Sequence, residues 1–137
     1  MLMNTAAVVV TFNKPLLLKS CLSGIFSQIE MPNSIFVIDN SADTATYNLC
    51  LTKLNINKNA QETEFGRLYS GKLKDLNTFY LSKSENDGGA GGFYSGIELA
   101  ISFKFDYLWL MDDDGIPHNK SLYFLKKTYK PDSILNP

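Results

Sequence analysis

Short apolar runs that alternate with segments of helical periodicity restrict the fold of this chain more than any other feature. The runs are continuous and rich in branched residues, and they lie at residues 4–12, 34–39, 78–81 and 106–111. Such runs are typical of strands that are covered on both faces of a parallel sheet. Apolar residues recur at helical spacing between them, which predicts helices near residues 15–29, 45–56, 93–105 and 119–129. The alternation requires crossover connections, so the sequence predicts an α/β fold with a mostly parallel sheet and flanking helices.

The composition restricts the class of protein. The 137 residues, of which 45% are apolar and 20% charged, suit one globular domain. A net charge of −1 with Arg67 as the one arginine argues against nucleic-acid binding. No apolar run is long enough to span a bilayer, and residues 1–5 show no signal-peptide pattern. Cys21 and Cys50 fall in apolar stretches of expected helices, so we expect buried, reduced thiols and a cytoplasmic protein.

One stretch does not fit the alternation. Residues 57–75 are polar and lack a period. They are too many for an ordinary connection in a compact domain, so we expect either a functional loop or a short hidden element.

Polar residues follow each expected strand at the point where it ends. They are Thr11–Asn13, Asp39–Ser41, Asn86–Gly92 and Asp112–Asp114. The carboxyl ends of parallel strands meet at one edge of a sheet, and ligands of open α/β sheets bind outside that edge. The sequence therefore predicts one site built from these four segments.

The three consecutive carboxylates of Asp112, Asp113 and Asp114 repel one another, which stability alone does not favour. A hard divalent cation such as Mg²⁺ or Mn²⁺ removes this conflict, because it binds carboxylate and phosphate oxygens. On an extended segment Asp112 and Asp114 point to one side and Asp113 to the other. The alternative is a solvated acidic turn.

Five of the nine glycines fall between Gly88 and Gly96, after a strand and before a helix. Glycine there lets backbone N–H groups approach a phosphate or a sugar. The dinucleotide fingerprint is excluded because Tyr94 takes its last glycine position, and the phosphate-loop motif is excluded because Ile97 takes the lysine position. A flexible loop is the alternative.

The ends of the first two strands also carry candidate ligand-binding groups. Asp39 ends a buried strand, where it is suited to accept from a base N–H or a ribose hydroxyl. Helix capping by Ser41 or Asp43 competes with a binding role for the residues that follow. Thr11 and Asn13 are candidates that also suit a simple turn.

Four segments in this order resemble the inverting glycosyltransferases of family 2, which have a GT-A fold. Val8–Asn13 is similar to their first strand, and Ile35–Asp43 is similar to their second strand with its nucleoside-binding aspartate. Asn86–Phe93 resembles their donor-binding motif, and Asp112–Asp114 resembles their metal-binding DxD motif. The double-glycine turn together with the acidic triplet looks most like the galactofuranosyltransferase and rhamnosyltransferase-like branch. The resemblance covers nearly the whole chain.

The resemblance implies that these residues bind a nucleotide-sugar donor. Asp39 would accept a hydrogen bond from the uracil or thymine ring N–H. Asp112 and Asp114 would bind Mn²⁺ or Mg²⁺ that bridges the diphosphate, and Asp113 would lie near the donor sugar. The donor-binding residues implied in this way are Thr11, Asn13, Asp39, Asn86, Gly88, Gly89, Gly91, Gly92 and Asp113.

The same resemblance implies that sugar transfer needs more chain than these residues. The general base of the family is a carboxylate downstream of the DxD motif, and Asp132, which precedes a short apolar stub, is not expected to be that base. We therefore expect residues 1–137 to be one nucleotide-sugar-binding domain, nearly inactive alone, with the base and the acceptor-binding part beyond Pro137. The full-length enzyme would transfer sugar from a UDP- or dTDP-linked donor to a glycan acceptor in cell-surface polysaccharide synthesis. It would work in the cytoplasm or at the inner face of the membrane.

Two other functions fit parts of the sequence. The segment Asp112–Gly115 is similar to the motif of haloacid-dehalogenase-type phosphatases, with Asp112 as nucleophile and Asp114 as general acid. That motif normally follows the first strand, however, and Ile116 replaces its threonine. The other alternative is a non-catalytic module that forms a homodimer through an exposed sheet edge.

Overall fold

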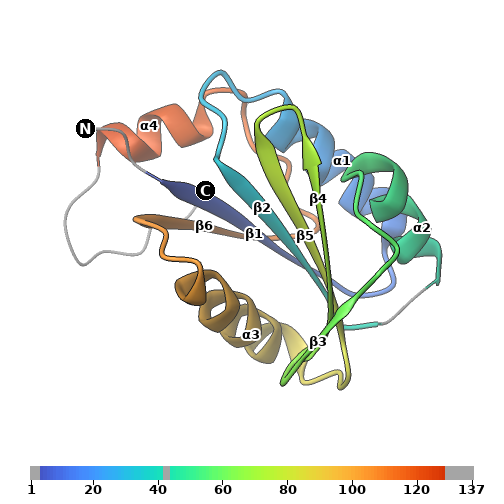
Figure 1. Ribbon diagram of the computed structural model, residues 1–137. Helices are drawn as coiled ribbons and strands as arrows, with labels where there is room; N and C mark the ends of the chain where they lie inside the picture. The colour runs from blue at the N-terminus through green and yellow to red at the C-terminus, as the bar shows by residue number, and fades with distance from the viewer. Residues whose placement is uncertain (1–3, 42–43, 129–137) are drawn as a thin grey trace.

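The computed structural model describes residues 4–41 and 44–128. Within them six strands form one sheet in the order β3-β4-β5-β2-β1-β6, flanked by four helices (Figure 1). The strands are β1 (Thr5–Thr11), β2 (Ser34–Asp39), β3 (Gln61–Thr63), β4 (Gly66–Leu73), β5 (Leu76–Lys83) and β6 (Tyr107–Asp112). The helices are α1 (Pro15–Phe26), α2 (Thr44–Lys53), α3 (Gly88–Ser102) and α4 (Ser121–Lys127). The expectations about Asp43, Asp132 and residues 133–137 lie outside the described residues.

The predicted parallel core of the sheet is confirmed. β5, β2, β1 and β6 are neighbours and run parallel to one another. In register, Thr11 at the end of β1 pairs with Asp39 of β2, and Val10 pairs with Asp112 of β6. The three strands therefore end side by side, as the sequence predicts for the polar segments that follow them.

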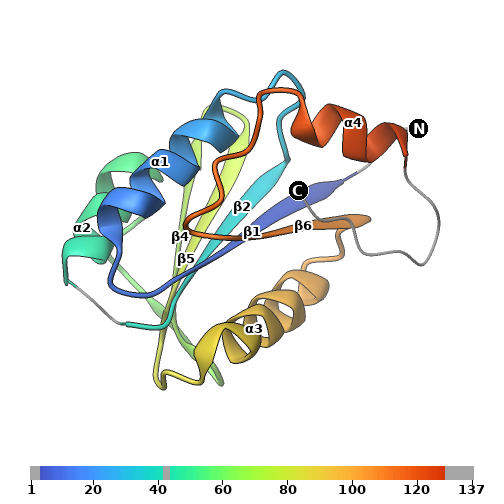
Figure 2. The ribbon, with the colours of Figure 1, turned by 180° about the vertical axis from the view of Figure 1, so that it is seen from behind.

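Helices cover both faces of the sheet. α1, α2 and α4 lie on one face and α3 lies on the other, as the two opposite views show (Figures 1 and 2). Residues of β1 alternate between two cores: Ala7 and Val9 pack with α1, whereas Val8 and Val10 pack with α3. Cys21 and Cys50 are buried and free, as expected. Burial raises the pKa of the Cys21 thiol to about 12, so that thiol stays neutral.

The polar stretch at residues 57–75 contains regular structure. β3 and β4 both lie within it, and β4 pairs antiparallel with β5 across a turn at Lys74 and Asp75. Side chains of β4 alternate between the core and solvent over its first residues. A strand with one wet face carries few apolar residues, which is why its sequence reads as a loop.

The buried face of α3 coincides only in part with its apolar stripe. Helical spacing in the sequence puts Phe93, Ile97 and Ile101 on one stripe; Phe93 packs against the core, whereas Ile101 is 57% exposed. The residues of α3 that are buried are mostly small: Gly92, Ser95, Gly96, Leu99 and Ala100. A Cβ atom on Gly96 would lie 2.6 Å from Cγ1 of Val8, so the helix lies too close to the sheet for larger side chains.

Helical spacing in the sequence also puts Ile29 on the apolar stripe of the first helix and points Leu122 and Leu125 of the last helix inward, which the structure bears out in part. α1 ends at Phe26, and Ile29 lies beyond it with its side chain 62% exposed, so Ile29 is not part of the inner face. In α4, Leu122 is buried and Leu125 packs against the same core, as expected.

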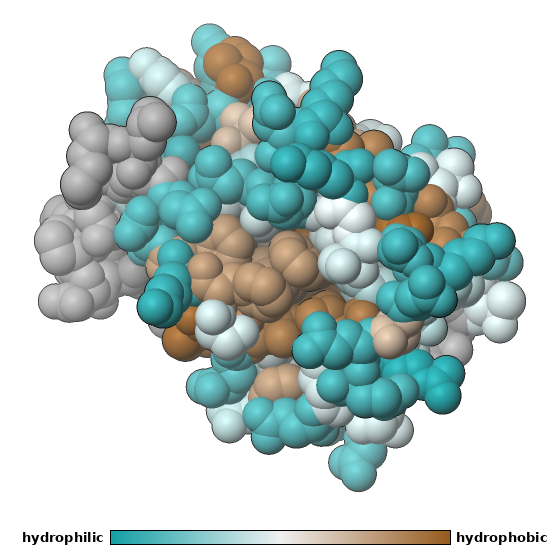
Figure 3. Space-filling model, viewed as in Figure 1, coloured by the Kyte–Doolittle hydropathy of each residue, from teal (hydrophilic) through white to brown (hydrophobic). Residues whose placement is uncertain are grey.

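An aromatic area lies on the α3 side of the sheet. The rings of Phe36 and Phe79 stack with centroids 4.4 Å apart, and Phe103 packs 4.9 Å from Phe79 with its side chain 44% exposed. Figure 3 shows an apolar area in the middle of this face. β3 and β6 are the edge strands of the sheet, so association through an exposed edge stays a prediction. None of the helices in the described part of the chain is long and apolar enough to cross a bilayer.

Candidate functional site

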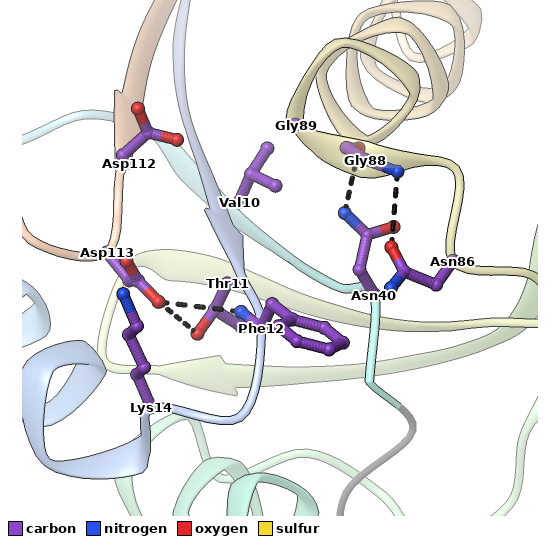
Figure 4. Close-up of a pocket in the computed structure, with 10 residues that line it drawn as sticks. All are labelled: Val10, Thr11, Phe12, Lys14, Asn40, Asn86, Gly88, Gly89, Asp112 and Asp113. Atoms are coloured by element: carbon purple, nitrogen blue, oxygen red, sulfur yellow. Dashed lines mark hydrogen bonds between the residues drawn. The ribbon is translucent and has the colours of Figure 1, made fainter.

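A cavity of about 290 Å³ lies where β1, β2 and β6 end and α3 begins (Figure 4). Its walls come from segments far apart in the sequence that the parallel register brings together. The residues that line it are Val10, Thr11, Phe12, Lys14, Asn40, Asn86, Gly88, Gly89, Asp112 and Asp113. The predicted site residues among them are Thr11, Asn86, Gly88, Gly89, Asp112 and Asp113. The convergence of the strand ends is therefore a feature of the structure.

Asp113 links the end of β6 to the end of β1 through hydrogen bonds. Its Oδ2 atom accepts a hydrogen bond from Oγ1 of Thr11 at 2.8 Å and one from the backbone N–H of Phe12 at 3.4 Å. Its own N–H donates to the carbonyl of Val10 at 3.1 Å. Asp113 is buried, whereas Asp112 and Asp114 on either side of it are exposed. This matches the predicted alternation of the triplet, and it gives Asp113 a structural role at the cavity wall.

Asp112 lines the cavity, and Asp114 does not. Partial burial raises the pKa of the Asp112 carboxyl, and the nearby charges of Asp114 and Asp113 raise it further. Like charges thus disfavour the ionised form of Asp112, which is the conflict that the sequence predicts.

The glycine segment forms the first two turns of α3, so the expected turn is correct only up to Asp87. Gly88 has a φ of 78°, a conformation that suits glycine. Its N–H donates to Oδ1 of Asn86 at 3.1 Å, and its carbonyl accepts from Nδ2 of Asn40 at 3.0 Å. A Cβ atom on Gly88 or Gly89 would meet nothing within 4 Å, so the backbone here is open to the cavity.

The N-cap side chain does not cap α3, and of the N–H groups at this end that of Gly88 is already bound by Asn86. Asp87 occupies the N-cap position, but its carboxylate pairs with the buried ammonium of Lys83 and makes no capping hydrogen bond. That contact lowers the pKa of Asp87. First-turn N–H groups of a helix point outward along its axis and attract anions. Because Gly88 and Gly89 line the cavity, this end of α3 is suited to bind an anionic ligand.

Asp39 does not line the cavity. Its carboxylate is fully buried, and Oδ2 accepts a hydrogen bond from the hydroxyl of Tyr80 at 2.5 Å. Oδ1 accepts from the N–H of Ser41 at 2.9 Å and from the Ser41 hydroxyl. Burial raises the pKa of Tyr80, and the charge of Asp39 raises it further, so the phenol stays neutral. Asp39 thereby holds the turn that places Asn40 in the cavity wall.

Three other predicted residues also lie outside the cavity lining. Asn13 is exposed and has a φ of 51°, in keeping with its alternative reading as a turn residue. Gly91 lies against the side chain of Asp87. Gly92 packs on Val10, where a Cβ atom would lie 2.6 Å from Cγ1. Gly91 and Gly92 therefore shape α3 and do not face the cavity.

Comparison with known proteins places the chain in a family. The model of the family described as glycosyl transferase family 2 matches residues 6–132. The chain belongs to glycosyl transferase family 2. This agrees with the resemblance that the four sequence segments carry. No observation here favours the phosphatase alternative for this family 2 chain.

Two relatives fall in the branch that the glycine segment and the triplet indicate. The chain is 32% identical over 111 residues to the galactofuranosyltransferase GlfT1 of Mycolicibacterium smegmatis, which is 81% of this chain and 30% of that protein. It is 31% identical over 109 residues to the galactofuranosyltransferase GlfT1 of Mycobacterium tuberculosis, which is 80% of this chain and 30% of that protein. The chain thus spans less than a third of the length of these relatives.

The fold of the family 2 chain agrees with a solved structure. The crystal structure of S. aureus TarS matches it with a TM-score of 0.58 at 17% identity, over 91% of this chain and 19% of the TarS chain. The mostly parallel sheet with helices on both faces is therefore a GT-A-like fold, as expected.

Four cavity residues of this family 2 chain were not singled out as site residues: Val10, Phe12, Lys14 and Asn40. Phe12 and Asn40 lie within two of the predicted segments, whereas Val10 and Lys14 lie just outside them. Phe12 continues an apolar strand pattern, yet its side chain is 45% exposed at the cavity. Asn40 is 5% exposed, and its Oδ1 atom is buried without a hydrogen-bond partner. Their position in the sequence could have indicated them, because each is next to a residue that was singled out as a candidate.

No group of three His, Cys, Asp or Glu side chains in residues 4–41 and 44–128 forms a ready-made metal site. Asp112, which lines the cavity, and Asp114, two positions further along the chain, both have exposed side chains. Their binding of a cation therefore stays a prediction.

Proposed function

We propose that this chain forms the donor-binding site of a glycosyltransferase, in which the cavity at the strand ends holds a nucleoside diphosphate sugar together with a divalent cation. One observation carries the proposal: the cavity joins Asp112 and Asp113 to the open N-terminus of α3 in a family 2 chain. A diphosphate suits such a cavity, because backbone N–H groups bind its oxygens directly and carboxylates bind them through a cation.

The residues present fit a hard divalent cation. Partial burial raises the pKa of Asp112, and repulsion from Asp114 and Asp113 raises it further; a cation would relieve this repulsion. Mg²⁺ and Mn²⁺ commonly use one or two carboxylates, with water and phosphate oxygens as the other ligands, so a set of three protein ligands is not required. We assign Asp112 and Asp114 as its ligands. When bound, the cation would supply charge stabilisation for the diphosphate leaving group.

The nucleoside would occupy the part of the cavity formed by the end of β1. The exposed ring of Phe12 offers a flat apolar face for a base, and stacking of this kind is tolerant of base identity. The unpartnered Oδ1 of Asn40 is a hydrogen-bond acceptor in the same wall. Direct contact between Asp39 and a base N–H stays a prediction, and its bonds to Tyr80 and Ser41 support a positioning role.

The relatives suggest which sugar is transferred. Both are named galactofuranosyltransferases, which favours a galactofuranosyl group on a UDP- or dTDP-linked donor. The acceptor would be a glycan, and cell-surface polysaccharide synthesis is the process we propose. We propose that residues 1–137 are the donor-binding part of the enzyme. We assign no general base, because both carboxylates that line the cavity serve the donor.

Calorimetric titration of the purified chain with UDP, dTDP and GDP tests this function. In the presence of Mn²⁺ or Mg²⁺ we expect binding of UDP or dTDP, and excess EDTA should weaken it by about tenfold or more, equivalent to about 1.4 kcal/mol. Asp112→Asn should weaken metal-dependent binding by a similar factor, because it removes a charged ligand of the cation.

Asp75→Asn is the matched control for this change. Asp75 lies in the turn between β4 and β5, away from the cavity, so its variant should bind as the unmodified chain does. The proposal is contradicted if the folded chain binds none of the three nucleotides. Binding that EDTA and Asp112→Asn both leave unchanged would contradict the assigned cation site.

A further inference from the structure

Lys14 is the cation among the residues that line the cavity. It lies three residues after the end of β1, directly before α1, and its side chain is exposed. Figure 4 shows this side chain extending from the start of α1 toward the carboxylate of Asp113, across the cavity from the N-terminus of α3. Lys14 therefore brings a positive charge to the wall that faces the open end of that helix.

Lys14 forms no ion pair within the described part of the chain. The ion pairs in the described part of the chain are Arg67–Glu62, Lys83–Asp87 and Lys126–Glu30, and Lys14 takes part in none of them. Oδ2 of Asp113 instead accepts from Thr11 and from the backbone of Phe12. The ammonium of Lys14 is thus available to another anion.

The side chain of Lys14 is also free of a structural task at the start of α1. Lys14 is the N-cap residue, but only its backbone serves the helix, since its carbonyl accepts from the N–H of Leu18 at 3.0 Å. No side-chain capping bond is formed at this position. A substitution that changes only the side chain therefore leaves the helix contact in place.

A diphosphate in this cavity would need more positive charge than a metal and a helix end provide. Two carboxylates line the cavity and a third adjoins it, and the N-terminus of α3 contributes about half a positive charge. A nucleoside diphosphate adds two to three negative charges of its own, by the ordinary ionisation of phosphates. The net charge of the occupied cavity stays negative even with one divalent cation. A further positive charge that faces the phosphates therefore lowers the repulsion between the phosphates and the carboxylates.

We propose that Lys14 binds the diphosphate of the nucleotide and makes the site select nucleoside diphosphates over monophosphates and nucleosides. This inference rests on the proposed function and adds a specificity-determining residue to it. A lysine suits the task, because its flexible stem carries a compact charge to phosphate oxygens without fixed geometry. The base would still be recognised at the end of β1, so its contribution to binding should not depend on Lys14.

The test compares UDP, UMP and uridine as ligands of the unmodified chain and of Lys14→Gln in the presence of Mg²⁺. We expect Lys14→Gln to weaken UDP binding by about fivefold to tenfold, as for a partly exposed charge pair, with a smaller effect on UMP and none on uridine. The difference should shrink as salt is added, because salt screens exposed charges. Lys14→Arg should bind UDP within about twofold of the unmodified chain, since it keeps the charge.

Lys19→Gln is the matched control, because Lys19 is an exposed lysine of α1 that does not line the cavity. Its variant should bind all three ligands as the unmodified chain does. Equal weakening of UDP and uridine in Lys14→Gln, or no weakening of UDP, would overturn the role of Lys14 while the proposed function stands. If the unmodified chain binds no UDP at any metal concentration, the proposed function fails and this inference fails with it.

Discussion

Tyr80 holds the buried carboxylate at the end of β2. Its hydroxyl donates to Oδ2 of Asp39, and both residues are fully buried. Tyr80→Phe should lower the free energy of unfolding by about 1–3 kcal/mol, because a buried charged acceptor loses one of its donors. Urea denaturation at pH 7 measures this. It should also weaken nucleotide binding, because the turn that carries Asn40 is held by Asp39.

The matched control for this change is Tyr94→Phe. Tyr94 is 60% exposed, so removal of its hydroxyl should change the unfolding free energy by about 0.5 kcal/mol or less. Equal losses of unfolding free energy in the two variants would show that the hydrogen bond between Tyr80 and Asp39 does not stabilise the fold.

For single residues, the sequence predicts the place in the fold better than the contacts that the side chain makes. Asp39 stands where the pattern places it, at the end of a buried strand, but its main partner Tyr80 is 41 positions away on β5. Lys14 was missed, and Phe12 was not singled out within its segment, because exposure at a cavity depends on the path of the chain after β1, which no local pattern encodes. Position at a strand end is a local property, whereas contact is a property of the fold.

α3 is the element whose small residues set the shape of the site. Gly96 packs against Val8 and Ile38, where a Cβ atom would lie 2.6 Å and 3.0 Å from their Cγ1 atoms. Gly96→Ala should therefore lower the unfolding free energy by about 1–3 kcal/mol through overpacking. Thermal or urea denaturation measures the loss.

Gly89→Ala provides the contrast within the same helix. Its Cβ would meet no atom within 4 Å, so the variant should be as stable as the unmodified chain or up to about 1 kcal/mol more stable. If Gly96→Ala were as stable as Gly89→Ala, close packing of α3 on the sheet would not be the reason for its glycines.

Predictability differs among the elements for a physical reason. The four parallel strands were found because burial on both faces leaves continuous apolar runs. β3 and β4 were anticipated only as a short hidden element, one of two alternatives, because β3 is an edge strand and β4 beside it has one solvent-exposed face, where polar residues interrupt the pattern. The apolar stripe of α3 marks its inner face only in part, because the glycine and serine residues on that face carry no apolar signal, although close packing favours them.

For the molecule as a whole, the placement of the site was predictable and its chemistry only partly so. Parallel strands carry the polar segments to one end of the sheet, and this topology follows from the alternation alone. A second cavity of about 590 Å³ lies at the other end, between the α1–β2 connection and the β4–β5 turn, and residues such as Phe26, Met31 and Leu76 line it. It is larger and mainly apolar, so size alone would select the end of the sheet opposite to the predicted site.

Backbone amide chemical shifts of the isotopically labelled chain, followed during titration with UDP and Mg²⁺, test the central claim most directly. The nucleotide should bind at the carboxyl ends of the strands, so the largest changes should occur at Phe12, Asn40, Gly88, Gly89 and Asp113. The amides around Met31 and Leu76 at the other end of the sheet should stay unchanged and serve as an internal control. Changes confined to that other end, or no saturable change at the strand ends, would contradict the account.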